Sequence, residues 1–152
     1  MSKITQTPGT QLLLGIDHVA ITVADVDATC GFYDRLFGMR VLDDHRIEGR
    51  TIVRVIVVGG GVRLSVHQAG NGVELVAAKP TPGSVDICFR WSGAIAEAVE
   101  FLASHDIPLA DGPSPRRTAD ERPAQSVYFR DPDGNLIELM AADRGWPMER
   151  KR

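Results

Sequence analysis

Two stretches of the 152-residue chain have similar patterns, and each carries two residues of metal-binding type at matching places. The first stretch holds His18 and His67, and the second holds Asp86 and Glu138. His18 matches Asp86, and His67 matches Glu138. Imidazole nitrogens together with carboxylate oxygens suit Zn, Ni, Fe, Mn or Co. We therefore predict one site, shared by the two halves of the chain, that binds a single divalent metal ion.

Two histidines and one carboxylate leave coordination positions open for water or substrate, which indicates catalysis rather than a structural role. We predict His18, His67 and Glu138 as the ligands. Asp86 is predicted as a fourth ligand or as the group that orients a bound water. Glu138 is also the candidate for moving a proton during catalysis, with Asp86 as the second choice. A solitary strand histidine is usually a surface residue, so the prediction depends on the matched positions.

The hydrophobic pattern predicts the same order of elements in both halves. Residues 16–23 alternate between polar and apolar, which is typical of a half-buried strand. Asp25 suits the N-cap of a helix at residues 26–37. The further strands predicted for this first β-α-β-β-β unit are 39–43, 51–58 and 62–67. The second unit is predicted to contain a strand at 85–91, a helix at 94–104 and strands at 107–110, 126–130 and 135–141.

Residues 1–152 are predicted to form a single domain. Its units cover about residues 14–68 and 84–142, and residues 69–83 form the linker. Residues 1–11 are predicted to be a loose arm. Residues 112–125 contain three prolines and no apolar period, so we predict a long loop or lid there. Arg116 and Arg117 are interpreted as solvated charges of that loop.

Alternation along the strands places the apolar side chains on one face and a set of polar side chains on the other. That polar set comprises His18, Arg63, Ser65, His67, Asp86, Arg90 and Glu138. A polar face can simply be solvated, but a curled sheet would make it the lining of a cleft. We predict an α+β fold in which two βαβββ units form an open, curled mixed sheet, with the helices outside and a polar cleft inside.

Three side chains on or near the cleft face are predicted substrate-binding residues: Arg63, Arg90 and Tyr128. They either bind an anionic group of a substrate or pair with Asp86 and other acids to hold the cleft together. The formal net charge of −3 gives no reason to expect a nucleic-acid or anionic-membrane partner. The apolar run at residues 12–14 is too short for a signal or a membrane span, so we expect a cytoplasmic protein. Cys30 and Cys88 are expected to be reduced and structural.

Two motifs resemble the vicinal oxygen chelate superfamily, which includes glyoxalase I, extradiol dioxygenases, methylmalonyl-CoA epimerase, and fosfomycin and bleomycin resistance proteins. The first is Ile-Asp-His-Val-Ala-Ile-Thr-Val at residues 16–23, with Phe-Tyr at 32–33 and Leu-Phe-Gly-Met at 36–39. The second is Ser-Val-Tyr-Phe-Arg-Asp-Pro-Asp-Gly-Asn-Leu-Ile-Glu-Leu at residues 126–139. The resemblance spans residues 16–140 and is specific for the fold, but not for the reaction.

The resemblance implies that His18 and Glu138 stand at the ligand positions of the first and last strands. His67 ends the fourth strand, where glyoxalase-like members have Glu and epimerase-like members have Gln. Asp86 begins the fifth strand, where most metal-dependent members have His, so the second histidine is displaced in this chain. Members with one domain per chain typically form homodimers, and some build the site across the interface by exchanging units.

Three functions are compatible with this resemblance. The first is a metal-dependent isomerase or lyase of the glyoxalase type, in which the metal chelates two neighbouring oxygens of a small substrate and stabilises an enediolate. The second is an Fe(II) extradiol-type dioxygenase, which the ligand count favours and Asp86 disfavours. The third is a metal-free binding protein of the bleomycin-resistance type, with His18 and His67 as hydrogen-bonding wall residues.

Overall fold

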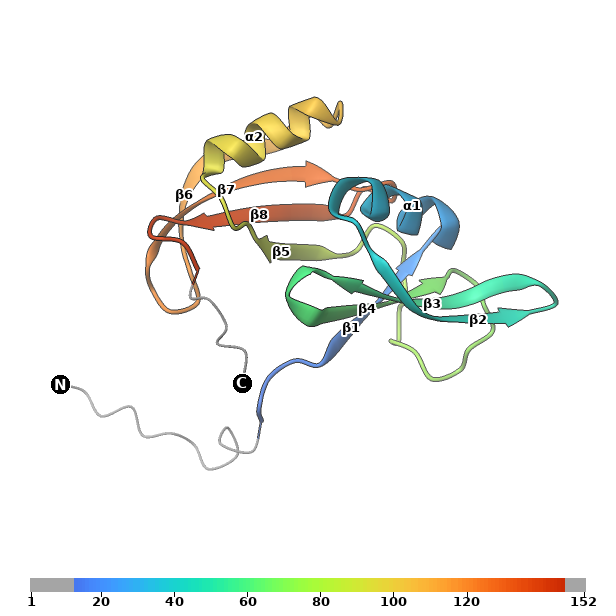
Figure 1. Ribbon diagram of the computed structural model, residues 1–152. Coiled ribbons are helices and arrows are strands. Elements are labelled where there is room, and N and C mark those ends of the chain that lie inside the picture. Colours follow the sequence, from blue (N-terminus) through green and yellow to red (C-terminus); the bar gives the residue numbers. More distant parts are fainter. Residues whose placement is uncertain (1–12, 147–152) are drawn as a thin grey trace.

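A computed structural model describes residues 13–146, and Figure 1 shows two βαβββ units that follow one another along the chain. The first unit consists of β1 (His18–Val23), α1 (Val26–Phe37), β2 (Arg40–Ile47), β3 (Arg50–Val58) and β4 (Val62–Gln68), with a short 3-10 turn at Gly59–Gly61 before β4. The second consists of β5 (Asp86–Arg90), α2 (Ile95–Ser104), β6 (Asp111–Arg117), β7 (Pro123–Arg130) and β8 (Leu136–Ala142). The predicted loose arm lies outside the described residues.

Each unit builds its own four-stranded mixed sheet. The strand orders are β1-β4-β3-β2 and β5-β8-β7-β6. The β1–β4 and β5–β8 pairs are parallel, and the other pairs are antiparallel. The predicted α+β fold with two βαβββ units is therefore confirmed, with its strands divided between two sheets. β1 and β5 each lie at a sheet edge, next to a single hydrogen-bonded neighbour.

Helix α1 connects the two units because it is apolar on two flanks. Asp25 caps its start by accepting a hydrogen bond from the backbone nitrogen of Ala28 at 3.1 Å. One flank packs against the first sheet through Val26 and Cys30. The other flank, with Tyr33 and Leu36, packs against α2, β7 and β8. Both helices lie on the same side of the two sheets (Figure 1).

Neither helix in residues 13–146 is long and apolar enough to cross a membrane.

The prediction of a long loop at residues 112–125 is wrong, because this segment contains most of β6 and the start of β7. The strand predicted at 107–110 is also wrong, because the sixth strand begins at Asp111. The physical reason is that β6 is an edge strand, where proline is tolerated because one side of the strand needs no hydrogen-bond donors. Because β6 contains prolines and lacks apolar alternation, its sequence does not show the pattern expected of a strand.

The turn Asp131–Asn135 joins the second unit to the first. The buried carboxylate of Asp131 accepts hydrogen bonds from the Tyr33 hydroxyl and from the Asn135 amide nitrogen Nδ2, both at 2.9 Å. One carboxylate oxygen of Asp133 accepts from the backbone nitrogen of Ala24 at 3.0 Å. The sequence predicted only a hairpin turn here, but the turn is also the polar joint between the two units.

Candidate functional site

The predicted polar residues do share a face, which we call the open face: the side of each sheet that points away from α1 and α2. On β1 and β4, buried Ile21, Leu64 and Val66 point toward the helix side. His18 and His67, at the alternate positions, lie on the open face of the first sheet. On β5 and β8 the same alternation places Asp86, Cys88 and Glu138 on the open face of the second sheet, opposite buried Ile137 and Leu139.

The registers of the β1–β4 and β5–β8 pairs show which residues of the two units occupy equivalent positions. The pairs that set them are His18 with Arg63, Thr22 with His67, Asp86 with Leu136, and Cys88 with Glu138. When His18 is matched to Asp86, the residue that corresponds to Glu138 is Ser65, and His67 lies two residues further along β4. The two matches predicted from the sequence therefore cannot both hold. His67 pairs four residues along β1 from His18, a separation of about 13 Å at about 3.3 Å per residue.

The predicted ligands are not gathered within one copy of the chain. No three His, Cys, Asp or Glu side chains among the described residues lie close enough together to hold a metal ion. His18 and His67 belong to the first sheet, whereas Asp86 and Glu138 belong to the second. A single copy thus presents two half-sets of donors on two separate open faces.

Glu138 has a buried carboxylate oxygen with no hydrogen-bond partner among residues 13–146. Its Oε1 is buried and accepts no hydrogen bond from the described part of the chain. Its neighbours across the sheet are Cys88 on β5 and Tyr128 on β7. Desolvation of the Cys88 sulfur, with a further contribution from the Glu138 carboxylate, raises the pKa of that thiol to about 12. Cys88 is therefore a neutral thiol at physiological pH.

The two histidines have surroundings that suit metal-binding or proton-accepting groups. The Nδ1 atom of His18 lies 2.8 Å from Oδ1 of Asp17, and a carboxylate at one ring nitrogen leaves Nε2 free to face outward. Desolvation lowers the pKa of His67, so its imidazole is neutral near pH 7. Neutral imidazole is the form that binds metals and accepts protons. The donor chemistry on the open faces thus fits a divalent ion.

Arg116 is exposed, as predicted, but it lies on a strand and not in a loop. It lies on β6, and its Nε donates a hydrogen bond of 2.7 Å to the Tyr128 hydroxyl. Its guanidinium carbon lies 5.4 Å from the centre of the Tyr128 ring. Register places Tyr128 directly beside Glu138, so the predicted position of Tyr128 at the site is consistent with the structure. Burial raises the pKa of the Tyr128 phenol, although the Arg116 hydrogen bond opposes this rise.

The other two predicted arginines have different surroundings. The Arg90 guanidinium lies 4.9 Å from the ring centre of Trp146, on which Arg122 also stacks at 5.5 Å. The indole nitrogen of Trp146 is 3.1 Å from the backbone oxygen of Trp91, to which it donates. These contacts favour the reading in which Arg90 holds the structure together. Arg63 is exposed on the open face, paired with His18 in the sheet.

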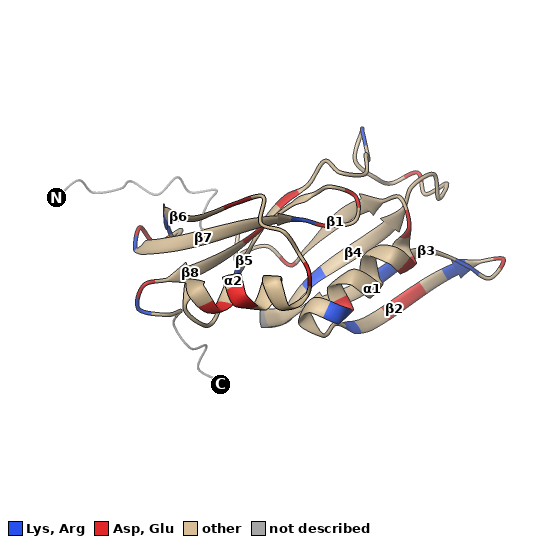
Figure 2. Cartoon of the chain, turned by 90° about the horizontal axis from the view of Figure 1, so that it is seen from above, with Lys and Arg blue, Asp and Glu red and all other residues tan. Residues whose placement is uncertain are grey.

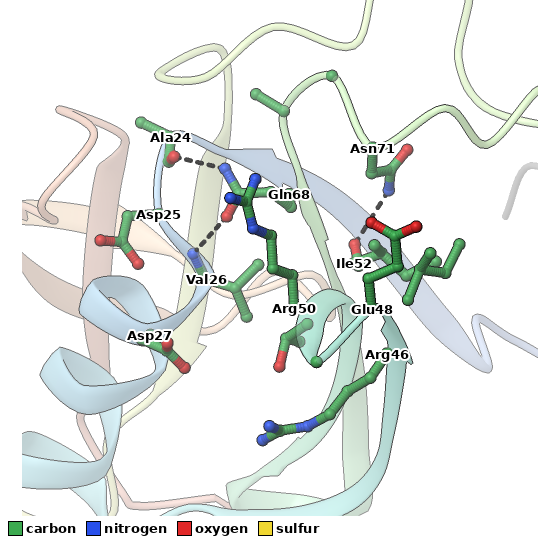
Figure 3. A pocket seen from close by; sticks show the side chains of 15 residues that line it. Ala24, Asp25, Val26, Asp27, Arg46, Glu48, Arg50, Ile52, Gln68 and Asn71 are labelled. Atoms are coloured by element: carbon green, nitrogen blue, oxygen red, sulfur yellow. Dashed lines mark hydrogen bonds between the residues drawn. The ribbon is translucent and has the colours of Figure 1, made fainter.

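A cavity of about 710 Å³ lies elsewhere, between the start of α1, the β2–β3 hairpin and the segment after β4. In Figure 3 the Gln68 side chain makes two hydrogen bonds to the backbone before α1. It donates to the Ala24 oxygen at 2.6 Å and accepts from the Val26 nitrogen at 3.1 Å. Asn71 donates to the Ile52 oxygen at 3.0 Å. None of the predicted ligands lines this cavity, although Nδ2 of its lining residue Asn71 lies 3.5 Å from Nδ1 of His67. Figure 2 shows acidic and basic residues interspersed over both units in the range 13–146.

Comparison with known proteins places the chain in a family. The model of the Glyoxalase/Bleomycin resistance protein/Dioxygenase superfamily matches residues 15–139. The glyoxalase domain-containing protein RDO1 of Mycosarcoma maydis is 41% identical over 124 residues, which cover 82% of this chain and 66% of that relative. The chain therefore spans slightly less than two thirds of that protein. The virulence protein STM3117 of Salmonella typhimurium is 35% identical over 124 residues, covering 82% of this chain and 81% of that protein.

Solved structures agree with this placement. The crystal structure of STM3117 superposes with a TM-score of 0.73 at 32% identity and covers 85% of this chain and 97% of that chain. An integron cassette protein from the mobile metagenome of V. cholerae also reaches 0.73 at 32% identity, covering 84% of this chain and 94% of that chain. Both share the open arrangement of two βαβββ units. The chain belongs to the Glyoxalase/Bleomycin resistance protein/Dioxygenase superfamily.

Proposed function

We propose that this protein is a metal-dependent isomerase or lyase of the glyoxalase type, acting on a small molecule with two neighbouring oxygens in the cytoplasm. Its metal-binding residues would be His18 and Glu138. A divalent ion bound there would act as a Lewis acid on the two substrate oxygens. The observation that carries the proposal is the buried Oε1 of Glu138, which has no hydrogen-bond partner in the described part of the chain and lies on a face that also holds Tyr128 and Arg116. A buried carboxylate oxygen without a donor is costly unless a cation or ligand satisfies it.

The proposal includes a homodimer in which the first sheet of one copy meets the second sheet of the other. It is supported by the separation of the donors into two sheets within one copy. The free edges of β1 and β5 supply unpaired backbone groups that a second copy would cover. Apolar side chains next to these donors are also exposed, among them Ile16 at 82% and Val62 at 43%.

The remaining residues take roles that follow from their positions. Because His67 lies about 13 Å from His18 along the strand, both cannot hold one ion from the same copy. The proposal therefore gives His67, a neutral imidazole, the role of contacting the substrate and accepting its proton. Asp86 lies on the same face, two residues along β5 from Cys88, which pairs with Glu138. It remains a candidate for orienting a bound water. Tyr128 holds its hydroxyl beside Glu138.

Metal content tests the assignment of ligands. The protein and its His18→Ala, Glu138→Gln and His67→Ala variants are stripped with chelator, loaded with Ni²⁺, desalted and measured by elemental analysis. We expect the first two variants to lose the ion, because the remaining donors cannot fix its geometry. His67→Ala and the matched carboxylate control Asp86→Asn should keep it, with affinity reduced about 10–100-fold at most. Full metal content in Glu138→Gln would refute the proposed site. Iron in protein purified without chelator would favour the dioxygenase alternative.

A mixing experiment tests whether two copies share the site. His18→Ala and Glu138→Gln chains are unfolded together and refolded as a mixture. If each site takes His18 from one copy and Glu138 from the other, every mixed dimer contains one intact site. Metal content should then recover to about one quarter of the wild-type value for random pairing in a two-fold dimer. No recovery would show that both ligands come from the same chain, and a monomer in light scattering would contradict the dimer itself.

A further inference from the structure

Arg116 is a cation held in a fixed position, and it has no carboxylate partner in the described part of the chain. Three contacts hold its guanidinium: Nε donates to the Tyr128 hydroxyl at 2.7 Å, Nη1 donates to the Pro115 oxygen at 2.8 Å, and the planar group lies 5.4 Å from the Tyr128 ring centre. None of the ion pairs among residues 13–146 includes Arg116. The Nη2 group is therefore available while the rest of the side chain is held in place.

The position of this cation is defined by the sheet. Arg116 pairs with Ala124, and Tyr128 pairs with Glu138, so alternation places all of them on the open face of the second sheet. Its neighbour Arg117 points to the opposite side of β6 and donates instead to the backbone oxygen of Glu121 at 2.9 Å. Of these two adjacent arginines, Arg116 is thus the one on the same face as Glu138, whose buried Oε1 has no hydrogen-bond partner among the described residues.

We propose that Arg116, positioned by Tyr128, binds an oxyanion group of the substrate, so that the substrate is a small acid rather than a neutral carbonyl compound. A guanidinium whose orientation is already fixed loses little side-chain entropy on binding, and it presents hydrogen-bond donors in the plane that suits a carboxylate or phosphate. The proposal deepens the proposed function and rests on it for the identity of the site. Anion binding by Arg116 itself needs no metal ion, so the two claims can be tested separately.

The test is a calorimetric titration of oxalate, and separately of inorganic phosphate, into the full-length protein after chelator treatment and again after loading with Ni²⁺. The variants are Arg116→Gln and the matched control Arg117→Gln, which removes the adjacent charge on the other side of the strand. Losing a charge-assisted hydrogen bond should weaken binding about 10- to 100-fold in Arg116→Gln. Arg117→Gln should differ from wild type by less than about threefold, as expected for an exposed charge.

The outcomes separate the two claims. Arg116-dependent binding of either anion to the metal-free protein supports the inference even if no metal loads, in which case the metal-dependent function fails alone. Oxalate or phosphate binding to the metal-free protein with the same affinity in Arg116→Gln, or no binding of either anion to the metal-free wild type, overturns the inference. Tyr128→Phe should lower anion affinity without changing Ni²⁺ content, which distinguishes positioning of Arg116 from a general loss of structure. Tighter binding of oxalate to the metal-free protein would favour a carboxylate group on the substrate, and tighter binding of phosphate a phosphate group.

Discussion

The hydrogen bond between Tyr33 and Asp131 gives the sharpest stability prediction, because it joins the two units inside the core. The Tyr33 side chain is 1% exposed, and its hydroxyl donates to Oδ2 of Asp131 at 2.9 Å. Tyr33→Phe removes this donor and leaves the ring in place. Burial, with the Asp131 carboxylate beside it, raises the pKa of the Tyr33 phenol, so the hydroxyl stays a donor at every working pH.

The expected loss of stability is limited, because Asp131 keeps its other hydrogen bonds in the Tyr33→Phe variant. Asp131 also accepts hydrogen bonds from the backbone nitrogens of Asp133 and Asn135 and from the Asn135 amide nitrogen Nδ2. The carboxylate therefore remains satisfied, and the variant loses one hydrogen bond to a charged group. We expect the free energy of unfolding to fall by about 2 kcal/mol. In a chain of this length that loss corresponds to a decrease of about 4–8 °C in Tm.

A double-mutant cycle with Asp131→Asn tests the reasoning by urea unfolding. Because the two side chains contact each other directly, the coupling energy should be about 1.5 kcal/mol. Tyr128→Phe serves as the control, since Tyr128 is only partly buried and its hydroxyl accepts a hydrogen bond from the exposed Arg116, and it should cost less than about 0.5 kcal/mol. Additive losses in the cycle, or a Tyr33→Phe variant as stable as wild type, would refute the view that this contact joins the units.

Two further predictions concern pH and backbone conformation. Desolvation lowers the pKa of His67 below the unfolded value of about 6.5, so the unfolded chain binds a proton first. In chelator, stability should therefore fall as pH drops from about 6.5 toward the lowered folded pKa, and His67→Gln should flatten that part of the curve of urea midpoint against pH. A Cβ on Gly83, at φ +79°, would lie 2.7 Å from the backbone oxygen of Asp133, whereas Gly134, at φ +82°, has nothing within 4 Å. Gly83→Ala should thus cost about 2 kcal/mol more than Gly134→Ala, which should itself cost about 1 kcal/mol for its left-handed backbone. Equal thermal midpoints for the two alanine variants would contradict this.

Local patterns predicted the elements whose causes are local. The helix expected at residues 26–37 is observed as Val26–Phe37, because its N-cap, its apolar face and the terminating Gly38 all lie within the segment. The alternation that put His18, His67, Asp86 and Glu138 on one side of their strands is also confirmed by the registers and the buried neighbours.

Properties set by long-range pairing could not be read in the same way. The register that separates His67 from the match to Glu138 depends on how β1 and β4 align, and no residue type in either strand encodes that alignment. Arg116 was predicted to lie in a loop because the prolines of the edge strand β6 interrupt the pattern expected of a strand. The role of Asp131 was missed because its partner Tyr33 is 98 residues away, and a turn motif carries no sign of such a contact.

The joint between the units also sets an order of events during protein synthesis. The Tyr33 and Leu36 flank of α1 packs against residues of the second unit, including Val127 and Phe129, in addition to its neighbours Phe32 and Phe37 on α1. The ribosome releases these partners last, and the 98 residues between Tyr33 and Asp131 take about 5–20 s to synthesise at about 5–20 residues per second. During that interval the nascent first unit exposes an apolar helix flank. The chain thus completes its fold only after its second half has been made, and chaperones that recognise exposed apolar surface have those seconds in which to bind it.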